Sequence, residues 1–244
     1  MDDKIKILDV KLDRVNMEQA CTRVEKFIDD DMGARMVVTP NSEMIVMAQK
    51  DRQLFEIINS ADLSVPDGAG VILASRILNN KLEERVAGFD LMNKLFERSV
   101  STGYSIYFLG GSQEVVHRAR EYVEKEFSGI NICGVHNGYL NEQLRKKVVE
   151  EINCLSPDLL FVGMGVPLQE KFIYDVRGDL NVGAVVAIGG SFDVLAGEKD
   201  RAPLWMQKSY LEWFYRLLKE PWRFWRMLAL PRFMFMVLWE KLWN

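Results

Sequence analysis

Polar and glycine-rich turns follow several short apolar runs of this chain, and their side chains could hold a ligand and move a proton. Asp67, in the turn Pro66-Asp67-Gly68, is placed to act as a general base towards a hydroxyl group. The other interpretation of Asp67 is a helix N-cap, because an apolar helical stretch follows it. Thr39 and Asn41 follow another run and have the same two interpretations, ligand contact or helix capping.

Two glycine-rich turns could offer backbone N–H groups to a phosphate. Gly110-Gly111-Ser112 opens a helix, whose free N–H groups attract anions, although a turn required only by backbone geometry also explains it. In Gly163-x-Gly165-x-Pro167-x-Gln169-Glu170, the first helical turn carries Gln169, which could bind a sugar or a uracil or could face solvent. Neither a G-x-G-x-x-G motif nor a P-loop is present, so neither dinucleotide binding nor ATP hydrolysis is indicated.

These turns can form one site only if the fold brings them together, and the pattern of the first 200 residues predicts such a fold. Short Val-, Ile- and Phe-rich runs alternate with amphipathic helical stretches, which indicates an α/β fold with a mostly parallel sheet and helices on both faces. Ligands of such folds bind beyond the carboxyl ends of the strands, where the turns lie. Asn16, Ser112 and Asn141 are predicted helix caps. The predicted strands are Ile5–Val10, Arg35–Thr39, Leu63–Val65, Ser105–Leu109, Ile130–Val135, Leu159–Val162 and Ala184–Ile188.

The composition changes abruptly at residue 201. From there on, eight Lys and Arg residues accompany three acids, a balance of +5, so residues 1–200 carry −9 of the net −4. All six tryptophans lie in residues 201–244. We therefore expect a catalytic body, residues 1–200, and a basic, Trp-rich helical tail, residues 201–244. The overall charge gives no reason to expect nucleic acid as a partner.

Cations of the tail could bind phosphate oxygens where another protein would use a metal ion. The chain has only two histidines, and its one Asp-rich run, 29–31, is interpreted as a solvated helix end, so we expect no metal site. Four cations spaced 3, 4 and 3 residues apart would share one face of a continuous helix, although Pro221 interrupts it. They are Arg216, Lys219, Arg223 and Arg226.

The aromatic residues of the tail favour association with a membrane surface. The longest uncharged run, Phe233–Trp239, is too short to cross a bilayer, which takes about 20 apolar residues. Basic residues mixed with Trp and Phe are typical of a helix in the interface plane, with a docking surface for a partner subunit as the alternative. A polar N-terminus and three widely spaced cysteines favour a cytoplasmic setting. A tail this apolar also allows a homo-oligomer that covers it.

Taken in order, the motifs resemble those of the WecG/TagA/CpsF glycosyltransferase family over nearly the whole chain. One departure is Ser112-Gln113-Glu114 after the glycines, where many relatives have Pro-Gly, which leaves the form of that turn open. The motifs that carry the resemblance are Thr39-Pro40-Asn41, Pro66-Asp67-Gly68-x-Gly70, Arg85-Val86-x-Gly88-x-Asp90, Phe108-Leu109-Gly110-Gly111, the Gly163–Glu170 motif, Gly189-Gly190-x-Phe192-Asp193, Arg201-Ala202-Pro203, and Leu211-Glu212-Trp213-x-x-Arg216 with Glu220-Pro221 and Arg223.

The resemblance implies a reaction that the residues alone do not. Family members transfer an N-acetylmannosamine-type sugar from a UDP donor to N-acetylglucosamine (GlcNAc) linked through diphosphate to undecaprenol. The transfer takes place on the cytoplasmic membrane face, for wall teichoic acid or related polymers. It inverts the anomeric centre and uses neither metal nor cofactor. The implied fold is Rossmann-like but distinct from the two commonest glycosyltransferase architectures.

The resemblance also implies roles for particular residues. Asp67 corresponds to the family's candidate base. The implied pocket residues are Thr39, Asn41, Arg85 and Gln169, and the implied tail cations are Arg216, Arg223 and Arg226. With the other turn residues, the expected substrate-binding set also includes Gly110, Gly111, Gly163, Gly165, Glu170 and Asp193.

Two other functions stay open at this point. A UDP-sugar epimerase would need neither lipid nor tail, and a nucleotide-binding membrane adaptor would form no product. An assay with UDP-N-acetylmannosamine (UDP-ManNAc) and a GlcNAc-diphosphate-lipid analogue, with and without the tail, separates these functions. The sequence leaves open whether the donor sugar is N-acetylmannosamine or its uronic acid.

Overall fold

The computed structural model describes residues 4–30, 32–209 and 211–243, without the side chains of Lys208, Arg216 and Arg223. Six strands form one parallel sheet in the order β4-β3-β8-β7-β5-β6, which confirms the predicted α/β class. Each of these strands coincides with a predicted run to within one or two residues. The strands are β3 (Arg35–Val38), β4 (Leu63–Ser64), β5 (Ser105–Gly110), β6 (Asn131–His136), β7 (Leu159–Gly163) and β8 (Ala184–Ala187).

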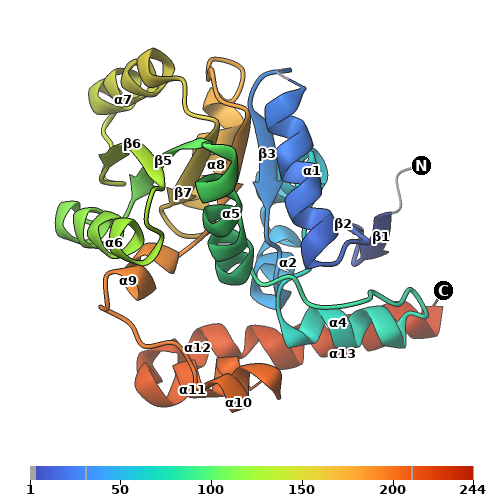
Figure 1. The fold of residues 1–244 in the computed structure, drawn as a ribbon. Helices are drawn as coiled ribbons and strands as arrows, with labels where there is room; N and C mark the ends of the chain where they lie inside the picture. The colour runs from blue at the N-terminus through green and yellow to red at the C-terminus, as the bar shows by residue number, and fades with distance from the viewer. Residues whose placement is uncertain (1–3, 31, 210, 244) are drawn as a thin grey trace.

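Helices cover both faces of the sheet (Figure 1). A hydrophobic cluster fills the space under each layer of helices. The caps predicted at Asn16, Ser112 and Asn141 are confirmed, because each side chain accepts the backbone N–H three residues on. The helices before the tail are α1 (Met17–Asp29), α2 (Ser42–Ala48), α3 (Arg52–Asn59), α4 (Ala69–Ile77), α5 (Gly88–Thr102), α6 (Gln113–Glu126), α7 (Glu142–Leu155), α8 (Leu168–Val176) and α9 (Ser191–Leu195).

The predicted strand over residues 5–10 is wrong. The segment turns back on itself as an antiparallel hairpin, β1 (Lys4–Ile7) and β2 (Val10–Asp13), which forms a separate two-stranded sheet. Leu8 and Asp9 form the turn with φ of 50° and 60°, a left-handed conformation that Asn and Gly usually supply. The turn is held from outside: Leu8 N–H donates to Glu240 Oε2 at 3.1 Å, and Leu8 C=O accepts from Gln49 Nε2 at 2.9 Å.

The tail consists of several short helices and one long one. Pro221 begins the 3-10 turn directly after α11, so the four tail cations do not lie on one continuous helix, and the joint predicted at this proline is confirmed. None of the described helices is long and apolar enough to cross a membrane. The elements are α10 (Leu204–Lys208), α11 (Glu212–Lys219), the 3-10 turn η1 (Pro221–Arg223), α12 (Phe224–Met227) and α13 (Ala229–Trp243).

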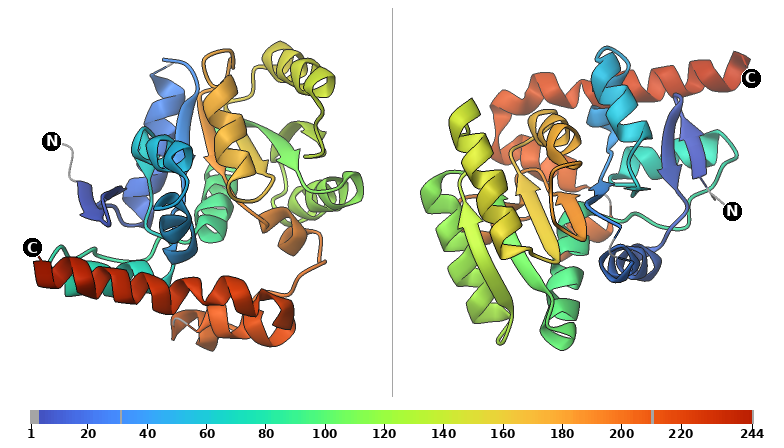
Figure 2. Two further views of the ribbon diagram at one scale, coloured as in Figure 1. Left: turned by 180° about the vertical axis from the view of Figure 1, so that it is seen from behind. Right: turned by 90° about the horizontal axis from the view of Figure 1, so that it is seen from above.

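The long helix α13 packs against the body along α2 and α4 (Figures 1 and 2). Phe233 and Val237 on its inner side are fully buried in the hydrophobic core. Phe235 and Trp239 on the opposite side are 66% and 56% exposed, and their rings stack with centroids 6.3 Å apart. The run that was predicted to lie on a membrane is thus divided, with one side in the core and the other exposed.

A polar pair is buried at the start of α8. Gln169 Nε2 donates to Glu170 Oε1 at 2.7 Å, and Gln169 Oε1 accepts Gly189 N–H at 2.9 Å, so neither side chain faces solvent. Glu170 Oε2 is buried without a hydrogen-bond partner among the described residues. Burial raises the pKa of the Glu170 carboxyl to about 7, against the smaller opposing effect of the hydrogen bond from Gln169.

We predict that Phe233→Ala destabilises the protein, while Phe235→Ala, two residues away on the exposed side, does not. Truncating a buried phenylalanine removes apolar contacts and leaves a cavity, which costs about 3–5 kcal/mol. The measurement is the free energy of unfolding in denaturant for both variants. Equal effects of the two substitutions would contradict the docking of α13 on the body.

We also predict that Glu170 makes the protein less stable as the pH rises from about 4.5 to about 7. The folded-state pKa lies above that of the unfolded chain, so the folded state binds the proton more tightly. This tighter binding of the proton stabilises the folded state fully at low pH, and the stabilisation is lost as the carboxyl ionises. The free energy of unfolding should fall by about 3 kcal/mol at most. Glu170→Gln should flatten this part of the pH–stability curve, whereas Glu121→Gln, at an exposed position, should leave it unchanged.

Candidate active site

The turns after β3 and β4 meet beside the first turn of α5. Gly88 N–H donates to Asp67 Oδ2 at 3.4 Å, and a Cβ added to Gly88 would lie 3.1 Å from Thr39 Cγ2. A Cβ added to Gly68 would lie 3.6 Å from Asn41 Cβ. The structure thus brings Thr39, Asn41 and Asp67 together at the carboxyl edge of the sheet, although the latter two are 26 residues apart in the sequence.

Capping distinguishes Asp67 from Asn41. Asn41 is the N-cap of α2, and its Oδ1 accepts Met44 N–H at 3.0 Å. The N-cap of α4 is Gly68 with φ of 88° and no side-chain bond, so the interpretation of Asp67 as the cap of the helix that follows it is wrong. The Asp67 carboxylate instead lies at the N-terminus of α5, where the partial positive charge of the helix stabilises an anion.

Close backbone packing or a positive φ explains the glycines at and after the ends of β5 and β7. A Cβ on Gly110, whose φ is 149°, would lie 2.3 Å from Gly163 O, so the two strand ends approach too closely for a side chain. Gly111 has φ of 63°, and Ser112 then caps α6, which settles the form of this turn. Gly165, with φ of 79°, ends the turn before α8, where Gln169 ties this half of the edge to the β8 turn at Gly189.

A cluster of four charges joins the tail to the body. Arg85 Nη1 lies 3.2 Å from Glu212 Oε2 of α11, and Arg85 Nη2 lies 3.9 Å from Asp90 Oδ2 of α5. Arg201 Nη2 lies 2.5 Å from Asp90 Oδ1, and Arg201 Nε lies 4.0 Å from Glu212 Oε1. The Arg201 guanidinium also lies over the Phe89 ring, 4.7 Å from its centroid. Arginine and carboxylate alternate around the cluster, so it fixes the start of α11 against the start of α5.

Of the three predicted tail arginines, only Arg226 has a side chain within the described part of the structure. Arg226 Nε lies 2.7 Å from Glu43 Oε1, in the first turn of α2 and two residues beyond Asn41. The side chains of Arg216 and Arg223 lie outside the described part of the structure. Asp193 forms an ion pair with Lys199 near the β8 turn, next to Gly190. Arg226 therefore reaches the same edge of the sheet as the group around Asp67.

Sequence reasoning did not include several of these residues in the site. Asp90, Arg201 and Glu212 form the charge cluster, and Glu43 holds Arg226. Arg85 and Glu212 are separated by 127 positions, so no local pattern reveals the pair. The available signal was the presence of acids in otherwise basic or glycine-rich motifs, at Asp90 and Glu212, where charge compensation is to be expected.

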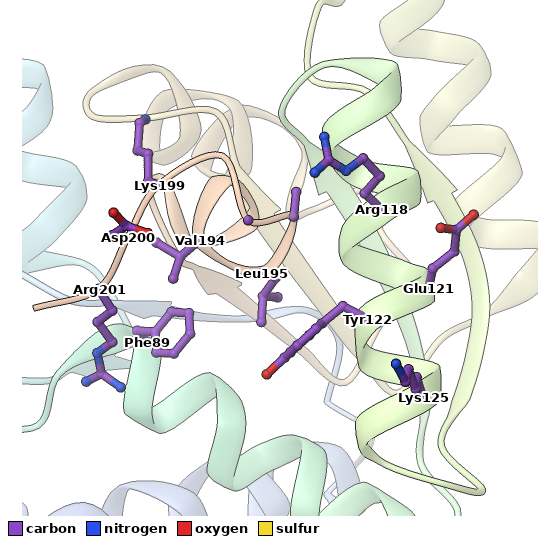
Figure 3. A pocket seen from close by; sticks show the side chains of 12 residues that line it. Phe89, Arg118, Glu121, Tyr122, Lys125, Val194, Leu195, Lys199, Asp200 and Arg201 are labelled. Carbon is purple, nitrogen blue, oxygen red and sulfur yellow. The ribbon is translucent and has the colours of Figure 1, made fainter. Parts of the chain in front are cut away.

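An open cavity of about 690 Å³ lies beside the charge cluster, between α5, α6, α9 and the segment that leads to α10 (Figure 3). Phe89 and Arg201 belong to its wall, together with Arg118 and Tyr122 of α6. The residues around Asp67 do not line it. The candidate site is therefore the group of residues around Asp67 at the carboxyl ends of the strands, and not this cavity. No group of three or more His, Cys, Asp or Glu residues suited to a metal ion occurs within the described ranges.

Comparisons with known proteins show the family of this chain. The model of the glycosyl transferase WecG/TagA/CpsF family matches residues 5–244. An N-acetylglucosaminyldiphosphoundecaprenol N-acetyl-beta-D-mannosaminyltransferase of Bacillus subtilis (strain 168) is 38% identical over 88% of this chain and 83% of its own. A protein of the same name from Staphylococcus aureus (strain MW2) is 32% identical over 96% of this chain and 92% of its own. The chain therefore belongs to the WecG/TagA/CpsF family of glycosyl transferases.

Proposed function

We propose that this chain transfers N-acetylmannosamine from UDP-ManNAc to the 4-hydroxyl of GlcNAc-diphosphate-undecaprenol, with inversion and without a metal ion. The observation that carries the proposal is the position of the Asp67 carboxylate at the carboxyl edge of the sheet, beside Thr39 and the N-terminus of α5. The names of the Bacillus and Staphylococcus relatives support the choice of acceptor and transferred sugar. The product is a β-linked disaccharide-lipid for wall teichoic acid or a related polymer.

The proposed step is a single displacement at the anomeric carbon. Asp67 accepts the proton of the acceptor hydroxyl, while the oxygen of that hydroxyl forms a bond to the anomeric carbon of the donor sugar. The bond from that carbon to the diphosphate oxygen breaks on the opposite side, and UDP leaves with the electron pair. The proposed sugar and nucleotide pocket includes Thr39, Asn41, Arg85 and Gln169. Gln169 contributes by accepting Gly189 N–H, which positions the β8 turn. The same pocket includes Gly110, Gly111, Gly163, Gly165, Glu170 and Asp193.

In this proposal the tail supplies the cations for the leaving diphosphate. Arginine forks bind phosphate oxygens in pairs, and preorganised cations stabilise the charge that develops on the leaving group. In this structure Arg226 pairs with Glu43 at the sheet edge, and we propose that it exchanges this carboxylate for the diphosphate. We assign the same phosphate-binding role to Arg216 and Arg223. The charges of Arg85 and Arg201 are compensated by Asp90 and Glu212, so these two arginines position the tail and do not by themselves provide excess charge.

We further propose that the tail binds the cytoplasmic surface of the membrane that carries the acceptor. Trp222 and Trp225 are 72% and 78% exposed, in the short segments between α11 and α13. Indole rings beside basic residues are suited to the interface between headgroups and acyl chains. The tail lies at the carboxyl edge of the sheet (Figure 1), so binding there would face the candidate site towards the lipid-linked acceptor.

The base assignment predicts that Asp67→Asn and Asp67→Ala lose activity to a similar extent, roughly 10²–10⁴-fold in kcat. Asparagine retains an oxygen that can accept Gly88 N–H, so it should preserve a purely structural function of Asp67. Disaccharide-lipid formation and UDP binding are measured for both variants. UDP should still bind. Near-normal turnover of Asp67→Asn would show that the residue serves only as a cap for α5.

The membrane proposal predicts that Trp222→Ala combined with Trp225→Ala weakens binding to anionic vesicles by roughly tenfold or more. Binding of the unmodified protein should also weaken as salt is added, because basic residues contribute to it. Vesicle co-sedimentation measures both effects. The control is Met32→Ala, which removes an exposed apolar side chain before β3, at the opposite edge of the sheet. An equal loss in the control, or none in the double variant, would contradict the proposal.

Point variants test the tail better than truncation does. Removing residues 201–244 would also remove Phe233 and Val237 from the core, so loss of activity could then reflect loss of folding. With the point variants, product from UDP-ManNAc and the lipid analogue supports the transferase, conversion of UDP-ManNAc without lipid would indicate an epimerase, and vesicle binding without product would indicate an adaptor. Sedimentation of the same samples reports whether the protein self-associates.

A further inference from the structure

The outer side of the C-terminal half of α13 presents an apolar stripe. Residues three, four or seven apart fall on one side of a helix, and here that side is opposite to the buried Phe233 and Val237. The rings of Phe235 and Trp239 stack with centroids 6.3 Å apart, and the tilted ring of Trp243 follows with its centroid 5.6 Å from that of Trp239. The stripe consists of Phe235, Leu238, Trp239, Leu242 and Trp243, each at least 49% exposed.

A groove of about 520 Å³ opens beside this stripe, between α13 and the turn of the β1–β2 hairpin. Its lining is almost entirely apolar: Leu8 forms the wall on the hairpin, and Phe235, Met236 and Trp239 form the wall on α13. Glu240 also lines the groove, but its carboxylate already accepts Leu8 N–H at 3.1 Å. The hairpin turn and the C-terminal part of α13 lie next to each other in both views of Figure 2.

The other end of α13 begins at the candidate active site. A Cβ added to Gly70, three residues beyond Asp67, would lie 2.8 Å from Leu230 Cδ1. Arg226, in the short helix directly before α13, is held at the first turn of α2 by Glu43. From Leu230 to Trp239 the helix rises about 14 Å at 1.5 Å per residue. One helix thus joins a cationic end, suited to a diphosphate, to an apolar groove about 14 Å away.

We infer that the groove between α13 and the β1–β2 turn binds the polyprenyl chain of the lipid-linked acceptor. The inference rests on the proposed function, which supplies an acceptor with a diphosphate head and a long apolar chain. The order of features along the tail matches the order of groups in that molecule: Arg226 beside the site first, then the apolar groove whose wall on α13 carries the rings of Phe235 and Trp239. An extended apolar chain follows such a path, whereas a folded protein surface would not enter a groove lined by five residues.

The test compares acceptors that differ only in the lipid. GlcNAc-diphosphate esters of methanol, geraniol and geranylgeraniol are assayed with UDP-ManNAc, without vesicles and below the concentration at which the esters aggregate. The KM for the acceptor should fall by roughly tenfold or more from the methyl to the geranylgeranyl ester, because apolar surface of the chain leaves water. In Phe235→Ser combined with Trp239→Ser, the ratio of the two KM values should approach one.

A matched variant separates the groove from other exposed aromatics. Trp222→Ser combined with Trp225→Ser removes two exposed rings before α13, and the dependence of KM on chain length should persist there. A second measurement does not depend on turnover: geranylgeranyl diphosphate should bind the unmodified protein more tightly than geranyl diphosphate by calorimetry. That difference should disappear in the Phe235 and Trp239 double variant.

The outcomes distinguish the inference from the function on which it rests. If no ester accepts sugar, the proposed function fails. If all esters react with equal KM, or if the double variant in the groove keeps the chain-length dependence, the inference is wrong and the transferase stands. Chain-length dependence that appears only with vesicles would assign the chain to the bilayer. Dependence that appears only at concentrations where the protein dimerises would assign it to a second copy of this chain, and both results would overturn the inference.

Discussion

The burial of Phe233 and Val237 under α2 and α4 is the interaction on which the arrangement of the tail depends. These two side chains make α13 a part of the core, although the helix belongs to a segment whose composition differs from that of the rest of the chain. Once α13 is fixed, α12 and Arg226 are held at the first turn of α2, and the opposite side of the helix has to face outwards. The exposed apolar stripe on the outer side of α13 is therefore a geometric consequence of the packing of this helix on α2 and α4.

The charge cluster complements this apolar contact at the other end of the tail. Arg85 and Arg201 alternate with Asp90 and Glu212, so α11 is positioned by directional ionic contacts, while α13 is positioned by burial of side chains. The two types of contact respond differently to solution conditions, because salt screens the former and hardly affects the latter. The segment between them, with the 3-10 turn at Pro221, lacks a buried residue among those described and is the part of the tail least supported by the body.

The sheet and most caps were predictable from the sequence because their signals are local. A run such as Leu159–Gly163 is apolar at every position, and Asn16, Ser112 and Asn141 stand where a helix needs a side-chain acceptor. The β1–β2 turn was missed because its left-handed residues are Leu8 and Asp9 and the partner that supports them, Glu240, is distant in the sequence. Similarly, the position of Asp67 was predictable, but not whether it caps α4, because Gly88 N–H, which it accepts, belongs to a later helix.

The bond between Glu240 and Leu8 also sets an order of events during synthesis. The carboxylate that accepts the N–H of the hairpin's unfavourable turn is made 232 residues after that turn. The sheet consists of parallel strands whose contacts close progressively as the chain lengthens, whereas this contact spans 232 positions and has to wait until α13 has been made. A nascent chain that lacks α13 therefore retains an unsupported β1–β2 turn as well as uncovered α2 and α4, and the folding of this one helix completes both regions.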